Sequence, residues 1–417
     1  MDPAALFLAL ALAITLPAQP AVEVIADLQV HGNVVTPDDE ILRLTGVQIG
    51  EPLDSGTVDA VASRLRASKR FQRVEVLKRF ASIADPSHIV LVVIVDEGPV
   101  RIETTGDGNQ PARIVRNRRV NLMFLPVLRY EDGYGVSYGV RFAAPNGAGK
   151  GGRVSVPLTW GGDKRAAIEL TKDLGTGPLS RAEAGTSISR RTHPFYQEHE
   201  NRGRVWARAT RDLHASLKVS VAAGWQHVSF RGIDDSFLEA GPEVVFDTRL
   251  DPILARNAVY LRGGWSHLAF RNGDAAGRSS LEGIGYLGLL GQTVLVVRAQ
   301  RDAAKRALPL YLQPILGGTD NLRGFRAGTA VGDTLVAGSA ELRTPLTSPL
   351  RIGKIGVSAF VDLGTVYNDG ERLSDHTMKK GVGGSVWFSV AVLRFSVAVA
   401  HGIGGSTRAH VGGSLSL

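Results

Sequence analysis

The fold is decided by short stretches such as residues 153–160, which read RVSVPLTW. Every second residue from Val154 to Trp160 is apolar, and the residues between them, apart from Pro157, are polar or charged. Successive side chains of a β-strand point to opposite faces of its sheet. This stretch therefore predicts a strand with one apolar face and one polar face.

The same period of two continues from residue 119 to the end of the sequence. It is clear in KRAAIELT (164–171), SLKVSVAAGW (216–225) and IGVSAFVDLG (355–364). An apolar face opposite a charged face suits a wall between lipid and a polar lumen. The alternative is a soluble sandwich, which would bury the apolar face against a second sheet. The longest strongly apolar run after the first 21 residues, IVLVVIV (89–95), is far shorter than a membrane-spanning helix.

The connections between these strands favour the barrel. Short turns such as TRDLH (210–214) alternate with longer polar segments such as THPFYQEHENRG (192–203). Short turns on one side and long loops on the other are typical of outer-membrane barrels, which have an even number of strands. Residues 119–417 are therefore predicted to form an all-β transmembrane barrel of about sixteen antiparallel strands.

The first 118 residues have a different pattern. Residues 4–16, AALFLALALAITL, are apolar but shorter than the about 20 residues of a spanning helix, so residues 1–21 are expected to be a secretory signal peptide. Residues 22–100 give the order strand, helix, helix, strand, strand, which predicts a small α/β domain. Residues 101–118 are expected to be a linker.

Composition excludes several functions. The chain has no cysteine, so disulfides and thiol chemistry play no part. Its formal charge is +8, but the Lys and Arg residues are scattered, with no basic arm and no aromatic platform for nucleic acid. No set of nucleophile, base and orienting residue stands out. We therefore expect no enzyme activity, no cofactor, no metal and no nucleic-acid partner.

The small domain resembles a known module. DLQVHGNVVTPDDEILRLTGVQIGEPLD (27–54), LRASKRFQRVEVL (65–77) and IVLVVIVDEGPV (89–100) are similar to a POTRA domain. The resemblance implies a periplasmic domain that binds extended client polypeptides along a sheet edge, by β-augmentation. We expect that edge on the strand that carries Val90, Val92 and Ile94. The alternative is that the domain is only a spacer.

The barrel contains a second resemblance, in LPLYLQPILGGTDNLRGFRAGTAVGDTLVAGSAELRTPL (308–346) and FVDLGTVY (360–367). These stretches resemble the outer-membrane protein assembly-factor superfamily, the BamA/TamA-like bacterial surface antigen barrels with POTRA domains. The resemblance implies that the loop at about 306–332 folds into the lumen, where its arginine pairs with acids on inner strand faces.

The residues themselves support such a loop. Glu341 and Asp362 fall on the inward phase of the strands that follow it, and the guanidinium of Arg323 is suited to bind carboxylates. Glycines on either side of Arg323 allow the backbone to bend sharply. We call this set the loop lock: Arg323, Gly324, Phe325, Gly317, Gly318, Glu341 and Asp362.

The seam, where the first and last barrel strands meet, is the expected exit for a client. Gly412 and Gly413 weaken the last strand, which also carries Leu415 and Leu417. The resemblance implies a barrel of the bacterial outer membrane that inserts or translocates polypeptides received from the POTRA domain. Its partners would be client polypeptides, the lipid bilayer and periplasmic accessory proteins. The alternatives are a secretion pore of the two-partner type and a passive pore or structural barrel.

Overall fold

The structure is a computed structural model that describes residues 22–33, 35–54, 56–71, 73–81, 87–97, 100–103, 113–116, 122–175, 177–250, 255–347, 353–390 and 393–415. The expected signal peptide, residues 1–21, and Leu417 of the expected seam lie outside the described residues. Among the residues that are described, no helix is both long enough and apolar enough to cross a membrane.

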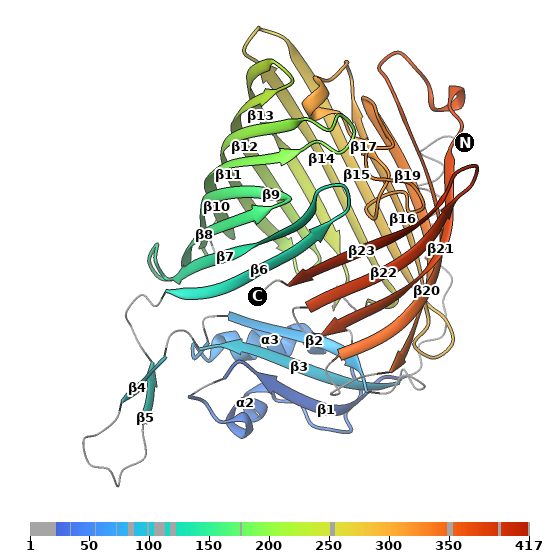
Figure 1. Cartoon of the computed structure of the whole chain (residues 1–417). Helices are drawn as coiled ribbons and strands as arrows, with labels where there is room; N and C mark the ends of the chain where they lie inside the picture. The colour runs from blue at the N-terminus through green and yellow to red at the C-terminus, as the bar shows by residue number, and fades with distance from the viewer. Residues whose placement is uncertain are drawn as a thin grey trace.

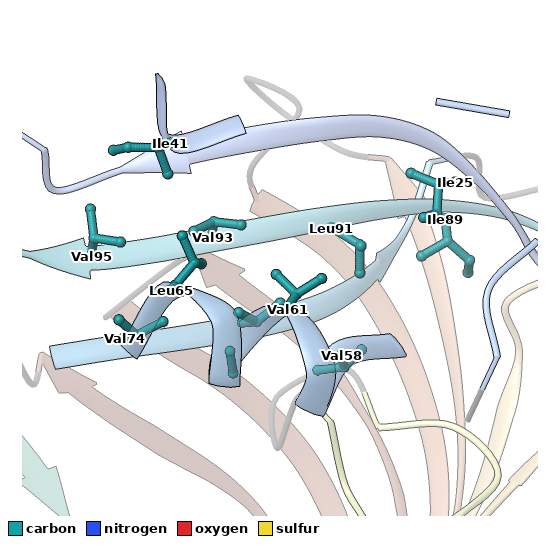
Figure 2. Close-up of a cluster of buried hydrophobic side chains, with 12 residues drawn as sticks. Ile25, Ile41, Val58, Val61, Leu65, Val74, Ile89, Leu91, Val93 and Val95 are labelled. Atoms are coloured by element: carbon teal, nitrogen blue, oxygen red, sulfur yellow. The ribbon is translucent and has the colours of Figure 1, made fainter. Parts of the chain in front are cut away.

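The N-terminal domain is a three-stranded sheet with two helices. Its elements are β1 (Val24–His31), α2 (Asp38–Thr45), α3 (Thr57–Ala67), β2 (Arg73–Phe80) and β3 (His88–Asp96). Branched aliphatic side chains from both helices and all three strands form its core, shown in Figure 2. Seven of them are completely buried: Ile25, Ile41, Val61, Leu65, Ile89, Leu91 and Val93. The predicted order of elements is confirmed.

The expected position of the sheet edge is wrong. The strands lie in the order β1-β3-β2, with β1 parallel and β2 antiparallel to β3. Val90, Val92 and Ile94 therefore belong to the central strand, which is paired on both sides. The reason is in the sequence, because an unbroken apolar run is typical of a strand that is covered on both faces.

The segment expected as a linker is not wholly irregular. It contains two short strands, β4 (Val100–Glu103) and β5 (Arg113–Arg116), which pair antiparallel with each other. This ribbon lies between the N-terminal domain and the barrel in the chain, and to the side of both in Figure 1.

Within the described residues, sixteen strands close into an antiparallel barrel. The ladder is consecutive along the chain except where β16 pairs directly with β19, and it closes between β23 and β6. The strands are β6 (Met123–Glu131), β7 (Gly135–Pro145), β8 (Gly152–Gly161), β9 (Asp163–Asp173), β10 (Arg181–Thr192), β11 (His199–His214), β12 (Leu217–Phe230), β13 (Ile233–Asp247), β14 (Ala258–Phe270), β15 (Ala275–Gly288), β16 (Val294–Ala304), β19 (Thr334–Thr347), β20 (Gly353–Tyr367), β21 (Lys379–Val390), β22 (Leu393–Gly402) and β23 (Thr407–Leu415).

The two faces of the barrel wall are as the period of two predicts. Val221 on β12 and Val361 on β20 are about half exposed on the outside, at 57% and 48%. Asp362, the next residue along β20, faces the lumen and is only 2% exposed. An apolar exterior and a polar interior are confirmed, so the alternative of a soluble sandwich is excluded.

The connection between β16 and β19 enters the lumen of the barrel. Between β16 and β19, residues 305–333 carry a short 3₁₀ turn, η1 (Leu310–Leu312), and a two-stranded ribbon of β17 (Ile315–Leu316) and β18 (Ala330–Val331). Figure 1 shows this segment within the outline of the barrel, while the N-terminal domain lies at the barrel end where β6 begins and β23 ends.

Candidate functional site: the luminal loop and the barrel seam

The loop between β16 and β19 is bent by glycines that no other residue could replace without strain. Gly317, Gly318 and Gly324 have φ angles of 109°, 85° and 92°, in the region that L-residues rarely adopt. A Cβ atom on Gly317 would lie 2.1 Å from the carbonyl oxygen of Arg326. Asn321 holds this bend from inside, because its side chain accepts from the backbone N–H of Gly317 at 2.8 Å and donates to the carbonyl of Ile315 at 2.9 Å.

Arg323 is carried by this bend to the wall of the barrel, where it binds Asp362 of β20. Its Nε and Nη2 atoms donate to the two carboxylate oxygens at 2.7 and 2.8 Å. Its backbone N–H donates to the same carboxylate at 2.9 Å. Paired bonds of this kind fix the plane of the guanidinium as well as its position.

The other contacts of Arg323 come from β19 and from the ring beneath it. Nη1 donates to Glu341 at 2.8 Å, and Nη2 donates to the hydroxyl of Ser339 at 3.1 Å. The guanidinium carbon lies 3.3 Å from the centre of the Phe360 ring, in the geometry of a cation–π contact. Arg323 therefore joins two adjacent strands to the loop.

The charges of this cluster balance locally. Arg343 also donates to Glu341, at 2.8 Å, so that two guanidinium groups face two carboxylates. The side chain of Arg323 is 14% exposed. Burial alone would lower the pKa of Arg323, but Asp362 and Glu341 raise it above its ordinary value. The loop therefore carries a permanent cation, and its departure would leave two buried carboxylates with Arg343 as the one remaining guanidinium of the cluster.

The loop backbone next to Arg323 lies against glycines of the barrel wall. A Cβ atom on Gly381 of β21 would lie 1.9 Å from the carbonyl oxygen of Arg323, and one on Gly402 would lie 2.9 Å from that of Gly324. The Phe325 ring lies over Gly402 at the end of β22. Without side chains at these positions, the wall admits the loop at backbone distance.

The outer part of the loop is held by a second cluster. Tyr311 of η1 donates to Asp235 at 2.6 Å and packs on Phe237. Nearby, His193 lies against the Phe230 ring, and burial lowers the pKa of this histidine to about 4. Within the described part of the chain, no group of three or more His, Asp or Glu side chains could hold a metal ion.

The seam is short. Within the described residues, β23 pairs with β6 over three residue pairs, from Gly413–Tyr130 to Leu415–Leu128. The adjoining pairs of strands, β22–β23 and β6–β7, have nine pairs each. Of the residues expected at the seam, Gly413 and Leu415 lie in this ladder and Gly412 lies one position beyond its outer end.

The structure brings together all seven residues of the loop lock and adds others that the sequence did not indicate. Ser339 and Phe360 complete the pocket of Arg323, and Asn321 shapes the bend. His410 of β23 accepts from the backbone N–H of Gly324 at 3.0 Å. Ser339 and Phe360 could have been predicted from the alternation of the strands. Ser339 lies on the same face of β19 as Glu341, and Phe360 lies on the same face of β20 as Asp362.

The family comparisons agree with this geometry. A model of the Omp85 superfamily domain matches residues 146–406, and a model of POTRA, described as a surface antigen variable number repeat, matches residues 23–98. No curated protein matches the chain.

Solved structures with the same fold include relatives of low sequence identity. BamA from Haemophilus ducreyi lacking POTRA domains 1–3 is 14% identical, with a TM-score of 0.61 over 96% of this chain and 85% of that one. CdiB from Acinetobacter baumannii is 13% identical, with a TM-score of 0.50 over 95% of this chain and 74% of that one. CdiB from Escherichia coli is 11% identical, with a TM-score of 0.50 over 96% and 92%. At these identities the likeness establishes the fold.

Proposed function

The chain belongs to the Omp85 superfamily, and on that premise we propose that it takes client polypeptides at its POTRA sheet and inserts them into the membrane through its seam. The barrel lies in the bacterial outer membrane, and the POTRA domain lies in the periplasm. Membership of the family implies a role in the assembly or translocation of outer-membrane proteins. Barrels of this superfamily are not enzymes.

Client capture is best supported at β2. The outer side of β1 is already bonded to residues 50–53 at its start: the Gly50 N–H donates to the carbonyl of Ile25, and the Ile25 N–H donates to the carbonyl of Glu51. Strand β2 is the other outermost strand of the sheet and pairs with β3 on one side. An extended client can add to such a strand through main-chain hydrogen bonds.

The observation that carries the proposal is the short seam. In the part of the chain that the structure describes, the seam has three residue pairs and so fewer main-chain hydrogen bonds to break than the neighbouring ladders, which have nine. Parting β6 from β23 would expose two strand edges, each able to pair with an incoming client strand. The free energy would come from client folding and from burial of its apolar face in lipid, so no nucleotide is needed.

The loop lock fits this proposal as the element that keeps the bore occupied. A loop tied to Asp362 and Glu341 fills the lumen on the β19–β21 side. An insertase works at the seam and can keep its bore occupied, whereas a secretion pore must clear it. This difference separates the proposal from its first alternative.

The proposal is tested by the folding of a client barrel in liposomes. A urea-unfolded outer-membrane barrel is diluted into vesicles that contain the full-length protein or lack it, and its folded fraction is followed by heat-modifiable gel mobility. We expect faster folding with the protein. Equal rates would argue against insertion, and a conductance that an unfolded secreted partner blocks would then favour the two-partner type of pore. A conductance with no such block would favour a passive pore.

A further inference from the structure

His410 occupies an unusual position on the last barrel strand. It lies near the outer end of β23 and is only 4% exposed, although Arg408 and Ala409 just before it are exposed. Both of its ring nitrogens have partners, and the partners come from different parts of the barrel. A buried imidazole with two such bonds fixes the relative position of both partners.

The two hydrogen bonds define which ring nitrogen of His410 carries the proton. Nε2 accepts the backbone N–H of Gly324 in the luminal loop at 3.0 Å. The proton of the neutral ring therefore lies on Nδ1, which donates to the carboxylate of Asp132 at 2.7 Å. A neutral His410 with this tautomer satisfies both partners at once.

Asp132 belongs to the opposite side of the seam. It follows β6 directly, in the turn that leads to β7. The seam ladder begins at Gly413–Tyr130, so the bond between His410 and Asp132 crosses the seam just beyond the outer end of that ladder. A side-chain bond thus joins the first and last strands where their backbone pairing has stopped.

The turn that carries Asp132 also packs directly on the loop. A Cβ atom on Gly318 would lie 3.2 Å from the Asp132 carboxylate, and one on Gly133 would lie 2.7 Å from the Cβ of Ala327. The first hairpin, the last strand and the loop therefore meet at one point, with His410 between them.

The loop attachment to His410 directly follows the attachment to β20. Arg323 is fixed to Asp362 by its side chain and its backbone, and the next N–H along the chain is the one that His410 accepts. Adjacent residues are about 3.8 Å apart, so the chain has no slack between the two attachments. Movement of Arg323 away from Asp362 necessarily moves the Gly324 N–H as well.

We propose that His410 is a latch that couples the loop lock to the seam. With the latch closed, the ring of His410 holds both Asp132 and Gly324 to β23, so displacement of the luminal loop from the wall loosens the outer part of the seam. Loss of either bond uncouples them. The inference concerns the barrel itself and holds whatever the client is.

The latch is tested by distance measurements across the seam. Because the chain has no cysteine, spin labels can be placed at Val136→Cys and Ala409→Cys, two exposed positions on either side of the seam. The full-length protein in lipid nanodiscs is measured by double electron–electron resonance. We expect one narrow distance in the parent protein. His410→Leu should add a longer component, with its population raised about tenfold, the effect of losing one or two buried hydrogen bonds.

Two further variants and one control complete the test. Asp132→Ala removes the same bond from the other strand and should add the same component, which keeps the test valid if His410→Leu fails to assemble. Arg323→Ala should also add it, and combining it with His410→Leu should add little more, because coupled residues are not additive. His401→Leu alters an exposed histidine on β22 that contacts Thr407 and should change nothing.

An unchanged distribution in His410→Leu and Asp132→Ala would overturn the latch. Fully additive effects of Arg323→Ala and His410→Leu would overturn the coupling. Since no client is present, these outcomes are independent of the liposome assay, and a failure of the proposed insertase function would leave them unaffected.

Discussion

Arg323 holds the loop through a combination of contacts that other cations cannot reproduce. Its guanidinium binds both oxygens of Asp362, reaches Glu341 and lies flat over the Phe360 ring. A lysine offers one ammonium group with neither the planar fork nor the flat face. Arg323 therefore fixes the loop to the barrel wall in one defined orientation.

Removal of this tie should destabilise the barrel. Arg323→Ala leaves Asp362 and Glu341 buried beside Arg343 alone, and loss of one partner from a buried ion pair costs about 3–5 kcal/mol. We expect the variant to lose its heat-resistant gel mobility at a clearly lower temperature, with Arg323→Lys between it and the parent protein.

Arg326 provides the matched control for that measurement. It lies in the same loop, is exposed, and forms no ion pair among the described residues. Substitution of an exposed residue of this kind changes stability by about 0.5 kcal/mol or less, so Arg326→Ala should behave as the parent protein does. Equal stability of the Arg323 and Arg326 variants would show that the loop is held by something else.

The sequence predicted the charged partners of Arg323 but not the rest of its surroundings. Glu341 and Asp362 could be predicted because a strand fixes the phase of its side chains, and each lies one position from an outward residue, Leu342 and Val361 respectively. His410 could not, because it is 86 positions from Gly324 in the chain. Only the closure of the barrel brings β23 to the loop, and no local pattern encodes that approach.

At the scale of elements, periodicity predicted the barrel strands well and the sheet edge badly. Alternation specifies which residues face lipid, so a barrel of about sixteen strands could be predicted, and sixteen close the barrel in the described residues. The order of strands in the POTRA sheet depends on long-range pairing instead. The apolar run at 89–95 was a signal for a central strand, since it can be covered on both faces.

The corrected sheet order gives a testable site for client contact. A photo-crosslinking residue at Lys78 on β2 should form adducts with an unfolded client barrel, because β2 is an outer strand. The same residue at Val24 on β1 is the control, since Val24 is bridged to Pro52 and residues 50–53 bond to the outer side of β1 there. Equal yields at both positions, or none at either, would contradict capture at β2.

At the scale of the whole molecule, the three functional parts lie close to one another. The POTRA domain touches the barrel where Arg256, in the β13–β14 connection, lies 5.9 Å from the centre of the Phe80 ring at the end of β2. The seam ends at the same end of the barrel, as Figure 1 shows, although the β13–β14 connection lies half-way round the ladder from it. The loop lock reaches toward the seam from inside, through Gly324 and His410. A client held on β2 would thus reach the seam at the end of the barrel that the POTRA domain faces.

The requirement for an opening seam can be tested by closing it covalently. Leu128 and Leu415 are register partners in the seam ladder, and directly opposite residues of antiparallel strands lie within the Cα range that a disulfide spans. A protein with Leu128→Cys and Leu415→Cys can form no other intramolecular disulfide, because the parent chain has no cysteine. The single-cysteine variants serve as controls for the oxidant.

The most direct measurement is the rate at which a client barrel folds in liposomes that contain this double-cysteine protein, oxidised and then reduced. If the seam must part for insertion, oxidation will lower the rate to that of protein-free vesicles and reduction will restore it. A rate that stays fully accelerated with the seam crosslinked would contradict insertion through the seam.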